Sequence, residues 1–273
     1  MRAIVKSPVC PLTCQPRRDR ERVDEALAGM VVEVLERTTS DYCRVRTHYR
    51  YEGYARVEDL VLSDEAAERW RGLPKKVVLH KNICDVMADP RVQSWQLCTL
   101  PRGAVVSPAG QPESGWQRVL LPDGGEGYLR AGWLGDYLDA PPELPENVLR
   151  RRIVETAMLY AGTSYRWGGK SPLGIDCSGL TSMAYLLNGI LIYRDARIVD
   201  GFPIHEIPRE EMRPADLLYF PGHIALYLGD GRYCHSTGRA GDDGFAVNSL
   251  IPSAPDYRAD LAEKLTQVGS YFH

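Results

Sequence analysis

The first half of the chain contains the same run of β-strand signals twice. Residues 29–46, GMVVEVLERTTSDYCRVR, align with residues 103–120, GAVVSPAGQPESGWQRVL. The segment GYARVEDL at 53–60 aligns with GYLRAGWL at 127–134. Each copy has apolar strand-like runs, a polar turn and a closing Gly-Tyr strand. An internal repeat of this length constrains the fold strongly, and it predicts two small β-barrels in succession.

The repeat and a proline-rich segment divide the chain into four expected regions. We expect a first β module at 1–62, a charged connector of helical composition at 63–75, a second β module at 76–139, and a third domain at 140–273. The sequence APPELP at 140–145 ends the second module. An amphipathic helical run, a second helix and then the strand-like runs DLLYF, HIALYLG and GRYCHST follow it. This order predicts an α+β class for the third domain.

Composition narrows the range of partners and compartments. The chain has 273 residues, 25% of them charged, and a net charge of −3. Because there is no basic excess and no long apolar run, we expect neither a nucleic-acid partner nor a membrane. We also expect a monomer. Seven irregularly spaced cysteines indicate no disulfide framework, and no cofactor is expected. The N-terminus lacks a signal-peptide pattern, which favours the cytoplasm; a removed leader would instead mean an extracytoplasmic protein.

The segment 165–187, YRWGGKSPLGIDCSGLTSMAYLL, has the features of a nucleophile at the start of a helix. Asp176 is a favoured N-cap residue type, so Cys177 is expected in the first turn, where the helix dipole favours a thiolate. One apolar face is expected on this helix, formed by Leu180, Met183, Ala184 and Leu187. For a lone cysteine, the alternative is a buried and inert thiol. A catalytic role therefore depends on finding a base.

Two histidines supply candidates for that base. His223 begins the alternating run HIALYL, and the turn signal Gly229-Asp230-Gly231 leads back along RYCHST. Because Gly229 is the midpoint between His223 and His235, a hairpin is expected to place the two histidines opposite each other. One could then deprotonate Cys177 while the other fixes its tautomer. A Cys/His zinc site that includes Cys234 is a rival, although neighbouring strand residues point to opposite faces.

The motifs YRWGG, DCSG, RPADLLYF, HIALYLG and YCHS together resemble the NlpC family of papain-like bacterial cysteine peptidases, over about the last 125 residues. The resemblance implies hydrolysis of the bond between γ-D-glutamate and an L-diamino acid, lysine or diaminopimelate, in peptidoglycan stem peptides. It implies the following roles: Cys177 as nucleophile, His223 as general base, His235 as orienting residue, Tyr165 at the oxyanion, and Asp176 and Ser178 lining the substrate. Tyr165 and Asp176 could equally be a packing aromatic and a helix cap.

Both β modules resemble bacterial SH3-like domains. Two such modules before this peptidase domain are similar to murein-peptide recycling endopeptidases, whose substrates begin with a free L-Ala. That subgroup has an Arg-Asp-Ser or Arg-Asp-Ala step, which matches Arg194-Asp195-Ala196 here, and the resemblance implies that Asp195 binds the substrate's α-ammonium. It also implies an acidic residue and a tyrosine from the first module, for which Glu25 and Tyr51 are the candidates. This chain has Tyr54 where the subgroup more often has tryptophan, which leaves the first-module contacts open.

Three functions remain distinct at this point. The first is a recycling endopeptidase that acts on short peptides with a free amino end. The second is a wall-binding endopeptidase that acts on intact peptidoglycan through the SH3-like pair. The third is a catalytically inactive wall-binding scaffold. A papain-like scaffold could also run another amide or acyl-transfer reaction, because a fold alone does not determine a function.

Overall fold

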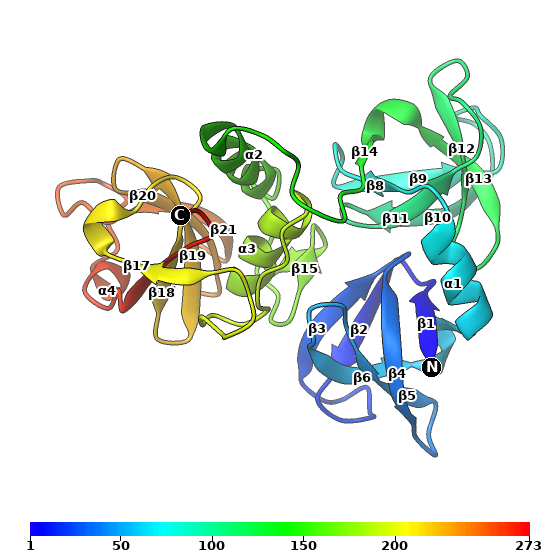
Figure 1. The fold of residues 1–273 in the computed structure, drawn as a ribbon, viewed down its shortest axis with the longest axis horizontal. Helices are drawn as coiled ribbons and strands as arrows, with labels where there is room; N and C mark the ends of the chain where they lie inside the picture. The colour runs from blue at the N-terminus through cyan, green and yellow to red at the C-terminus, as the bar shows by residue number, and fades with distance from the viewer. The chain divides into compact units, whose positions relative to one another are not determined.

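The computed structural model describes residues 1–273, and its backbone divides into two compact units, Met1–Tyr137 and Leu138–His273. The first unit is built almost entirely of β-strands, and the second combines helices with one large sheet (Figure 1). The expected fold class, two small SH3-like β modules before an α+β peptidase-like domain, is confirmed. Both β modules belong to a single compact unit.

The first module is a seven-stranded antiparallel sheet with the order β3-β2-β6-β5-β4-β1-β7. Its strands are β1 (Arg2–Val5), β2 (Val9–Thr13), β3 (Arg22–Leu27), β4 (Val31–Arg37), β5 (Tyr42–Arg46), β6 (Glu52–Arg56) and β7 (Leu60–Leu62). A short 3-10 helix, η1 (Val57–Asp59), precedes the last strand.

The second module repeats the first strand by strand. Its order is β10-β9-β13-β12-β11-β8-β14, which is the order of the first sheet with every label advanced by seven. Its strands are β8 (Lys76–Val78), β9 (Ile83–Met87), β10 (Gln96–Pro101), β11 (Val105–Pro108), β12 (Trp116–Leu120), β13 (Glu126–Arg130) and β14 (Leu134–Asp136). The 3-10 helix η2 (Ala131–Trp133) again precedes the last strand. The internal repeat predicted from the sequence is therefore a repeat of topology.

The charged connector between the modules is a helix, α1 (Asp64–Gly72). Ser63 caps it by accepting a hydrogen bond from the Ala66 backbone N–H. Trp70 is buried in one apolar cluster with Ile4 of the first module and Val105 of the second. Its indole N–H also donates to the Gly29 carbonyl oxygen at 2.9 Å. This helix therefore joins the two modules through a shared core.

The second unit contains a six-stranded antiparallel sheet with the order β17-β22-β18-β19-β20-β21. Its strands are β17 (His205–Ile207), β18 (Leu217–Phe220), β19 (His223–Gly229), β20 (Arg232–Thr237), β21 (Gly244–Ser249) and β22 (Gln267–Ser270). Its helices are α2 (Glu146–Met158), α3 (Cys177–Leu186), the 3-10 helix η3 (Arg209–Glu211) and α4 (Ala259–Ala262). A two-stranded hairpin, β15 (Lys170–Ser171) with β16 (Gly174–Ile175), lies before α3.

Helix α3 packs against α2 and against strands β19 and β20 (Figure 1). The apolar face expected for it is confirmed, because all four of its residues are buried: Leu180, Met183, Ala184 and Leu187. The packing of α3 on β19 and β20 brings the start of the helix to the strands that carry the two histidines.

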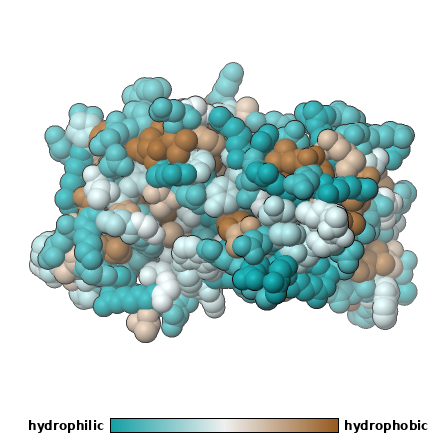
Figure 2. Space-filling view, turned by 90° about the horizontal axis from the view of Figure 1, so that it is seen from below, coloured by the Kyte–Doolittle hydropathy of each residue, from teal (hydrophilic) through white to brown (hydrophobic).

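All seven cysteines are free thiols. None of the helices combines the length and the apolar character needed to cross a bilayer. Figure 2 shows a face that is mostly hydrophilic, with hydrophobic side chains gathered in several separate patches.

Candidate active site

The segment before α3 is a tight hairpin that permits close approach of backbone to backbone. At Gly169 a Cβ atom would lie 2.3 Å from the Gly174 carbonyl oxygen, so no larger residue fits there. At Gly179 a Cβ atom would lie 2.1 Å from the Gly169 carbonyl oxygen. The glycines of the sequence motif therefore allow the hairpin to lie directly against the first turn of α3.

Asp176 is the N-cap of α3, as the sequence predicted. Its carboxylate accepts hydrogen bonds from the backbone N–H groups of Gly179 at 2.6 Å and Gly168 at 2.8 Å. Arg194 donates to both carboxylate oxygens, at 3.1 and 3.0 Å, and to the Ser178 hydroxyl at 2.6 Å. Because these contacts occupy both oxygens, Asp176 holds the helix start in place, and its contact with substrate stays a prediction. Ser178 likewise binds Arg194, and its substrate contact is also still a prediction.

Cys177 is the first residue of α3, and its side chain is buried. Burial, together with the charge of Asp176, raises the pKa of the Cys177 thiol to about 11. Hydrogen bonds from the backbone N–H groups of Ile224 and Ser178 to the thiol act in the opposite direction, as does the charge of Arg194. Ile224 follows His223 on β19, the strand on which α3 packs, so the pKa effect of its backbone is consistent with a sulfur that lies near the start of this strand. A thiol that is neutral at pH 7 needs a base in order to attack.

His223 and His235 are in direct contact. His223 Nε2 lies 2.7 Å from His235 Nδ1, and the two rings meet edge to face. The sequence predicted that the pair lies roughly opposite each other, and the structure adds the register. Leu226 pairs with Cys234, so His223 lies two residues out of register with His235 and reaches it along a diagonal.

The physical reason lies in the turn. Gly229 pairs with Arg232, so the two central residues of the turn are Asp230 and Gly231, whose φ angles are positive, 51° and 72°. An irregularity between Tyr227 and Gly229 adds one residue to β19. The hairpin is thus centred later than the sequence indicated, and the length of the histidine side chain bridges the offset.

Both histidines are held in the neutral form. Burial, and then the charge of His235, lowers the pKa of His223 to about 3. Burial lowers the pKa of His235 to about 4, and the hydrogen bond that His235 makes to Asn248 partly opposes this shift. Neutral imidazole is the form that can accept a proton, so both rings have the charge state of a base at pH 7.

Asn248, on β21, extends the pair to a third strand, and the sequence reasoning missed it. Its Oδ1 lies 2.8 Å from His235 Nε2, and its Nδ2 donates to the Asp256 carbonyl oxygen at 3.1 Å. The strand that carries it, GFAVNS, was not recognised from the sequence. The one available signal was the alternation of Phe245, Val247 and Ser249 with Ala246 and Asn248, which is weak evidence for so short a strand.

Tyr165 lies half-buried beside the nucleophile segment, with its ring against Gly238. Burial, followed by the charges of Cys177 and Asp176, raises the pKa of Tyr165 to about 12. The phenol therefore keeps its proton at neutral pH and can donate a hydrogen bond. Its position near Cys177 is compatible with the oxyanion role, which stays a prediction.

Arg194 and Asp195 follow α3 in the segment before β17. Arg194 is buried, and its guanidinium group is engaged by Asp176 and Ser178, so it connects this segment to the N-terminus of α3. Asp195 is half-buried. Its proposed contact with a substrate ammonium group is not tested by these contacts and stays a prediction.

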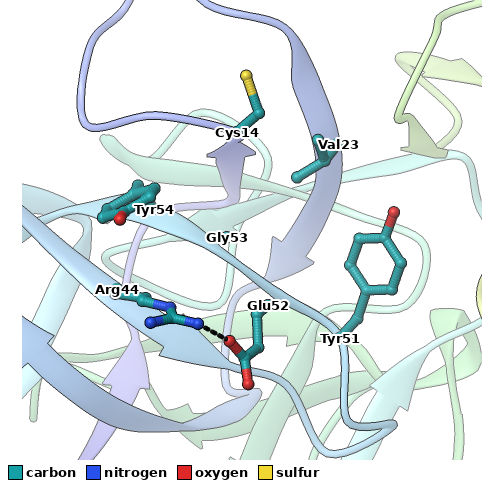
Figure 3. Close-up of a pocket in the computed structure, with 7 residues that line it drawn as sticks. All are labelled: Cys14, Val23, Arg44, Tyr51, Glu52, Gly53 and Tyr54. Atoms are coloured by element: carbon teal, nitrogen blue, oxygen red, sulfur yellow. Dashed lines mark hydrogen bonds and ion pairs between the residues drawn. The ribbon is translucent and has the colours of Figure 1, made fainter.

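Glu25 and Tyr51 both belong to the first unit. Glu25 is fully buried on β3 and accepts a hydrogen bond from Arg22 at 2.8 Å. Tyr51 lines a cavity of about 340 Å³ in the first module, and its side chain points away from the Arg44–Glu52 ion pair (Figure 3). Their role in substrate binding stays a prediction. The cavity is lined by Cys14, Val23, Arg44, Tyr51, Glu52, Gly53 and Tyr54.

The zinc alternative finds no support in the arrangement of side chains. No group of three or more His, Cys, Asp or Glu side chains is placed to hold a metal ion. Cys234 is fully buried and directly precedes His235 on β20. Neighbouring residues on a strand point to opposite faces of the sheet, so these two side chains cannot share one metal site. The side chains present suit nucleophilic catalysis by a thiol with an imidazole base.

A capped cysteine at a helix start, next to a histidine pair on an antiparallel sheet, is the arrangement of a papain-like cysteine peptidase. Residues 162–249, which contain Cys177, both histidines and Asn248, match the NlpC/P60 family. A protein of Lysinibacillus sphaericus named dipeptidyl-peptidase 6 is 45% identical over 275 residues, with complete coverage of both chains. The chain belongs to the NlpC/P60 family and is a peptidase of the kind that acts on cell-wall peptides.

Two further comparisons agree with this assignment. A γ-D-glutamyl-L-lysine dipeptidyl-peptidase of Bacillus cereus is 32% identical over 127 residues, which is 44% of this chain and 37% of that protein. The crystal structure of an NlpC/P60 family protein from Bacillus cereus superposes with a TM-score of 0.79 over 99% of both chains, at 21% identity. The second comparison shows a shared fold along the whole chain.

Proposed function

We propose that this chain is a cysteine peptidase that cleaves peptidoglycan stem peptides between γ-D-glutamate and the following L-diamino acid, lysine or diaminopimelate. Its preferred substrates begin with a free L-Ala, and the released product is L-Ala-γ-D-Glu. The observation that carries the reaction is the Cys177 thiol beside β19, next to the hydrogen-bonded pair of His223 and His235. The names of two relatives, both dipeptidyl-peptidases, support the release of a dipeptide.

The proposed reaction has two halves, formation of a thioester on Cys177 and hydrolysis of that thioester. As the Cys177 sulfur attacks the γ-carbonyl carbon, His223 takes the thiol proton. The carbonyl oxygen gains the negative charge and accepts hydrogen bonds from the Cys177 backbone N–H, which has no acceptor within the helix, and from the Tyr165 hydroxyl. The C–N bond then breaks, and His223 gives its proton to the leaving amine. Water hydrolyses the resulting thioester, again with His223 as base.

Selection for a free amino end is part of the proposal. An α-ammonium group needs a carboxylate partner once it leaves water, and a blocked substrate would leave that carboxylate unpaired at a cost. Asp195 is the candidate from the second unit, and Glu25 and Tyr51 are the candidates from the first. We further propose that the enzyme is monomeric and acts in the cytoplasm on recycled wall fragments, a location that cell fractionation can test.

The test compares L-Ala-γ-D-Glu-L-Lys with its N-acetylated form and with the diaminopimelate peptide, with products identified by mass spectrometry. We expect cleavage of the free peptides and at least a hundredfold lower kcat/KM for the acetylated one, because an unpaired buried charge costs several kcal/mol. The Cys177→Ala variant is the control and should be inactive. Equal turnover of free and acetylated peptides would rule out the free-amine requirement.

Purified sacculi form the second arm of the same experiment. Binding to sacculi and release of soluble fragments from them would favour an enzyme that acts on the intact wall. Failure of every peptide, with Cys177 unreactive toward iodoacetamide even at alkaline pH, would favour an inactive scaffold.

A further inference from the structure

Three polar side chains form a continuous hydrogen-bonded chain across three adjacent strands. His223 lies on β19, His235 on β20 and Asn248 on β21, and each reaches the next along a diagonal of the sheet. The nitrogen–nitrogen distance in the histidine pair is 2.7 Å, and the contact from His235 to Asn248 is 2.8 Å. His235 is fully buried and Asn248 is buried, so the contact between these two residues is shielded from water.

The direction of every hydrogen bond in this chain follows from its last member. The Asn248 amide nitrogen can only donate, and it donates to the Asp256 carbonyl oxygen at 3.1 Å. That bond turns the amide oxygen toward His235 Nε2. Because an amide oxygen can only accept, His235 Nε2 must carry a proton, and in the neutral ring Nδ1 then has the lone pair.

The same donor and acceptor rule applies to the ring of His223. His235 Nδ1 can only accept, so His223 Nε2 must donate to it. The neutral His223 ring therefore has its lone pair on Nδ1. We infer that Asn248 is a positioning residue that sets the tautomers of both histidines and thereby makes Nδ1 of His223 the atom that takes the proton from Cys177. This inference rests on the proposed function for the identity of the base.

Other charged and titratable groups surround the two histidines, and the substitutions at Asn248 leave these groups unchanged. Arg258 lowers the pKa of both histidines, and Asp260 opposes it from the same segment. These two are themselves paired, with two contacts of 2.7 Å. Asp176 acts on His223 from the start of α3, and the Tyr233 ring lies edge-on to His235. None of them bonds to the outer nitrogen of His235, where Asn248 acts.

The experiment uses the full chain with Asn248→Asp and Asn248→Leu. A carboxylate at 248 still accepts from His235 Nε2 but favours its doubly protonated form. That form donates from both nitrogens, so the proton of His223 is forced onto Nδ1 and the base is blocked. For Asn248→Asp we expect the acid limb of kcat/KM on L-Ala-γ-D-Glu-L-Lys to move up by at least about one pH unit.

For Asn248→Leu we expect kcat to fall about 10- to 100-fold at every pH, with KM within about twofold, because neither tautomer of His235 is then selected. The matched control is Asn188→Leu. Asn188 is another buried asparagine of the second unit, whose amide binds Thr156 and the Ala184 carbonyl oxygen. This substitution should lower stability without moving the acid limb.

A second readout needs no activity. ¹⁵N spectra of the imidazole nitrogens in the wild type should show His235 and His223 both protonated at Nε2. Protonation of His235 at Nδ1, or an unchanged acid limb in Asn248→Asp, would overturn the inference. If the wild type cleaves none of the peptides, the proposed function fails, while the ¹⁵N spectra still decide the tautomers.

Discussion

At the scale of single residues, burial sets the charge of the reacting groups. Cys177, with a pKa of about 11, and His223, with a pKa of about 3, are both neutral at pH 7. The two shifts share one cause, the cost of placing a charge in a poorly hydrated site. A proton transfer during attack therefore fits this site better than a thiolate that exists before the substrate arrives.

The lowered histidine pKa values predict that the second unit loses stability in mild acid. His235 has a pKa of about 4 when folded against about 6.5 when unfolded, so between these values the unfolded chain binds the proton more readily. Stability is therefore lost as the pH falls from 6.5 toward 4, by roughly 3 kcal/mol at pH 4 from this residue. His223 adds a loss of the same sign over a window that extends to about pH 3.

The measurement is urea unfolding of wild type and His235→Gln at several values between pH 7 and pH 4. Glutamine does not titrate, so the variant should show a shallower decline in unfolding free energy, with the share of His223 remaining. An identical decline in the two proteins would contradict the assignment of this proton to His235.

At the scale of elements, the start of α3 is held by one carboxylate. Asp176 caps the helix, fixes Gly168 and pairs with Arg194, so a single residue joins the hairpin, the helix and the segment that carries Asp195. A cap alone is worth about 1 kcal/mol, whereas removal of one partner from a buried ion pair costs about 3–5 kcal/mol. The position of the nucleophile therefore depends mainly on the ion pair between Asp176 and Arg194.

We therefore expect Asp176→Ala to lower the unfolding free energy by about 4 kcal/mol and to abolish peptide cleavage. Ser63→Ala is the matched control, because Ser63 caps α1 by accepting one hydrogen bond from the Ala66 backbone N–H and has no ion pair. It should cost about 1 kcal/mol and leave cleavage unchanged. Denaturant unfolding and peptide turnover measure both, and equal losses in the two variants would mean that the Arg194 pair adds nothing.

The strands of the second unit show where sequence reasoning succeeds. β18 and β19 are largely apolar, and β20 follows the turn signal after β19; all three were predicted, as was α3 with its buried face. β17, β21 and β22 have at most six residues each, with glycine in β21 and β22, and were not. Such segments are stabilised by their neighbours in the sheet more than by their own propensity.

At the scale of the whole molecule, the chain is two compact units, and the two β modules of the first share one core through α1. The second unit contains Cys177, His223, His235 and Asn248. The first unit contains Glu25 and Tyr51. If the first unit contributes to selection of a free amino end, chemistry and selection can be separated by cutting the chain between the units.

The prediction concerns residues 138–273 produced alone. Because this unit has its own sheet and helices, we expect it to fold, with a cooperative thermal transition by circular dichroism. It should cleave L-Ala-γ-D-Glu-L-Lys with a raised KM and discriminate less than the full chain against the N-acetylated peptide. If the fragment folds and keeps the full discrimination, Asp195 alone makes the selection, and the first-unit candidates are wrong.

The sequence by itself determined the repeat, the fold class, and the nucleophile and histidine candidates. Glycine spacing, capping and strand alternation are local signals, because each depends on residues that are close together in the chain. Only the tertiary structure decided the diagonal offset of His223 and His235, the contacts that occupy Asp176, and the contact of Asn248 with His235. These depend on the residues that form the turn and on the register between strands, which join residues far apart in the chain. No local pattern carries that information, since strand register is set by the packing of the whole sheet.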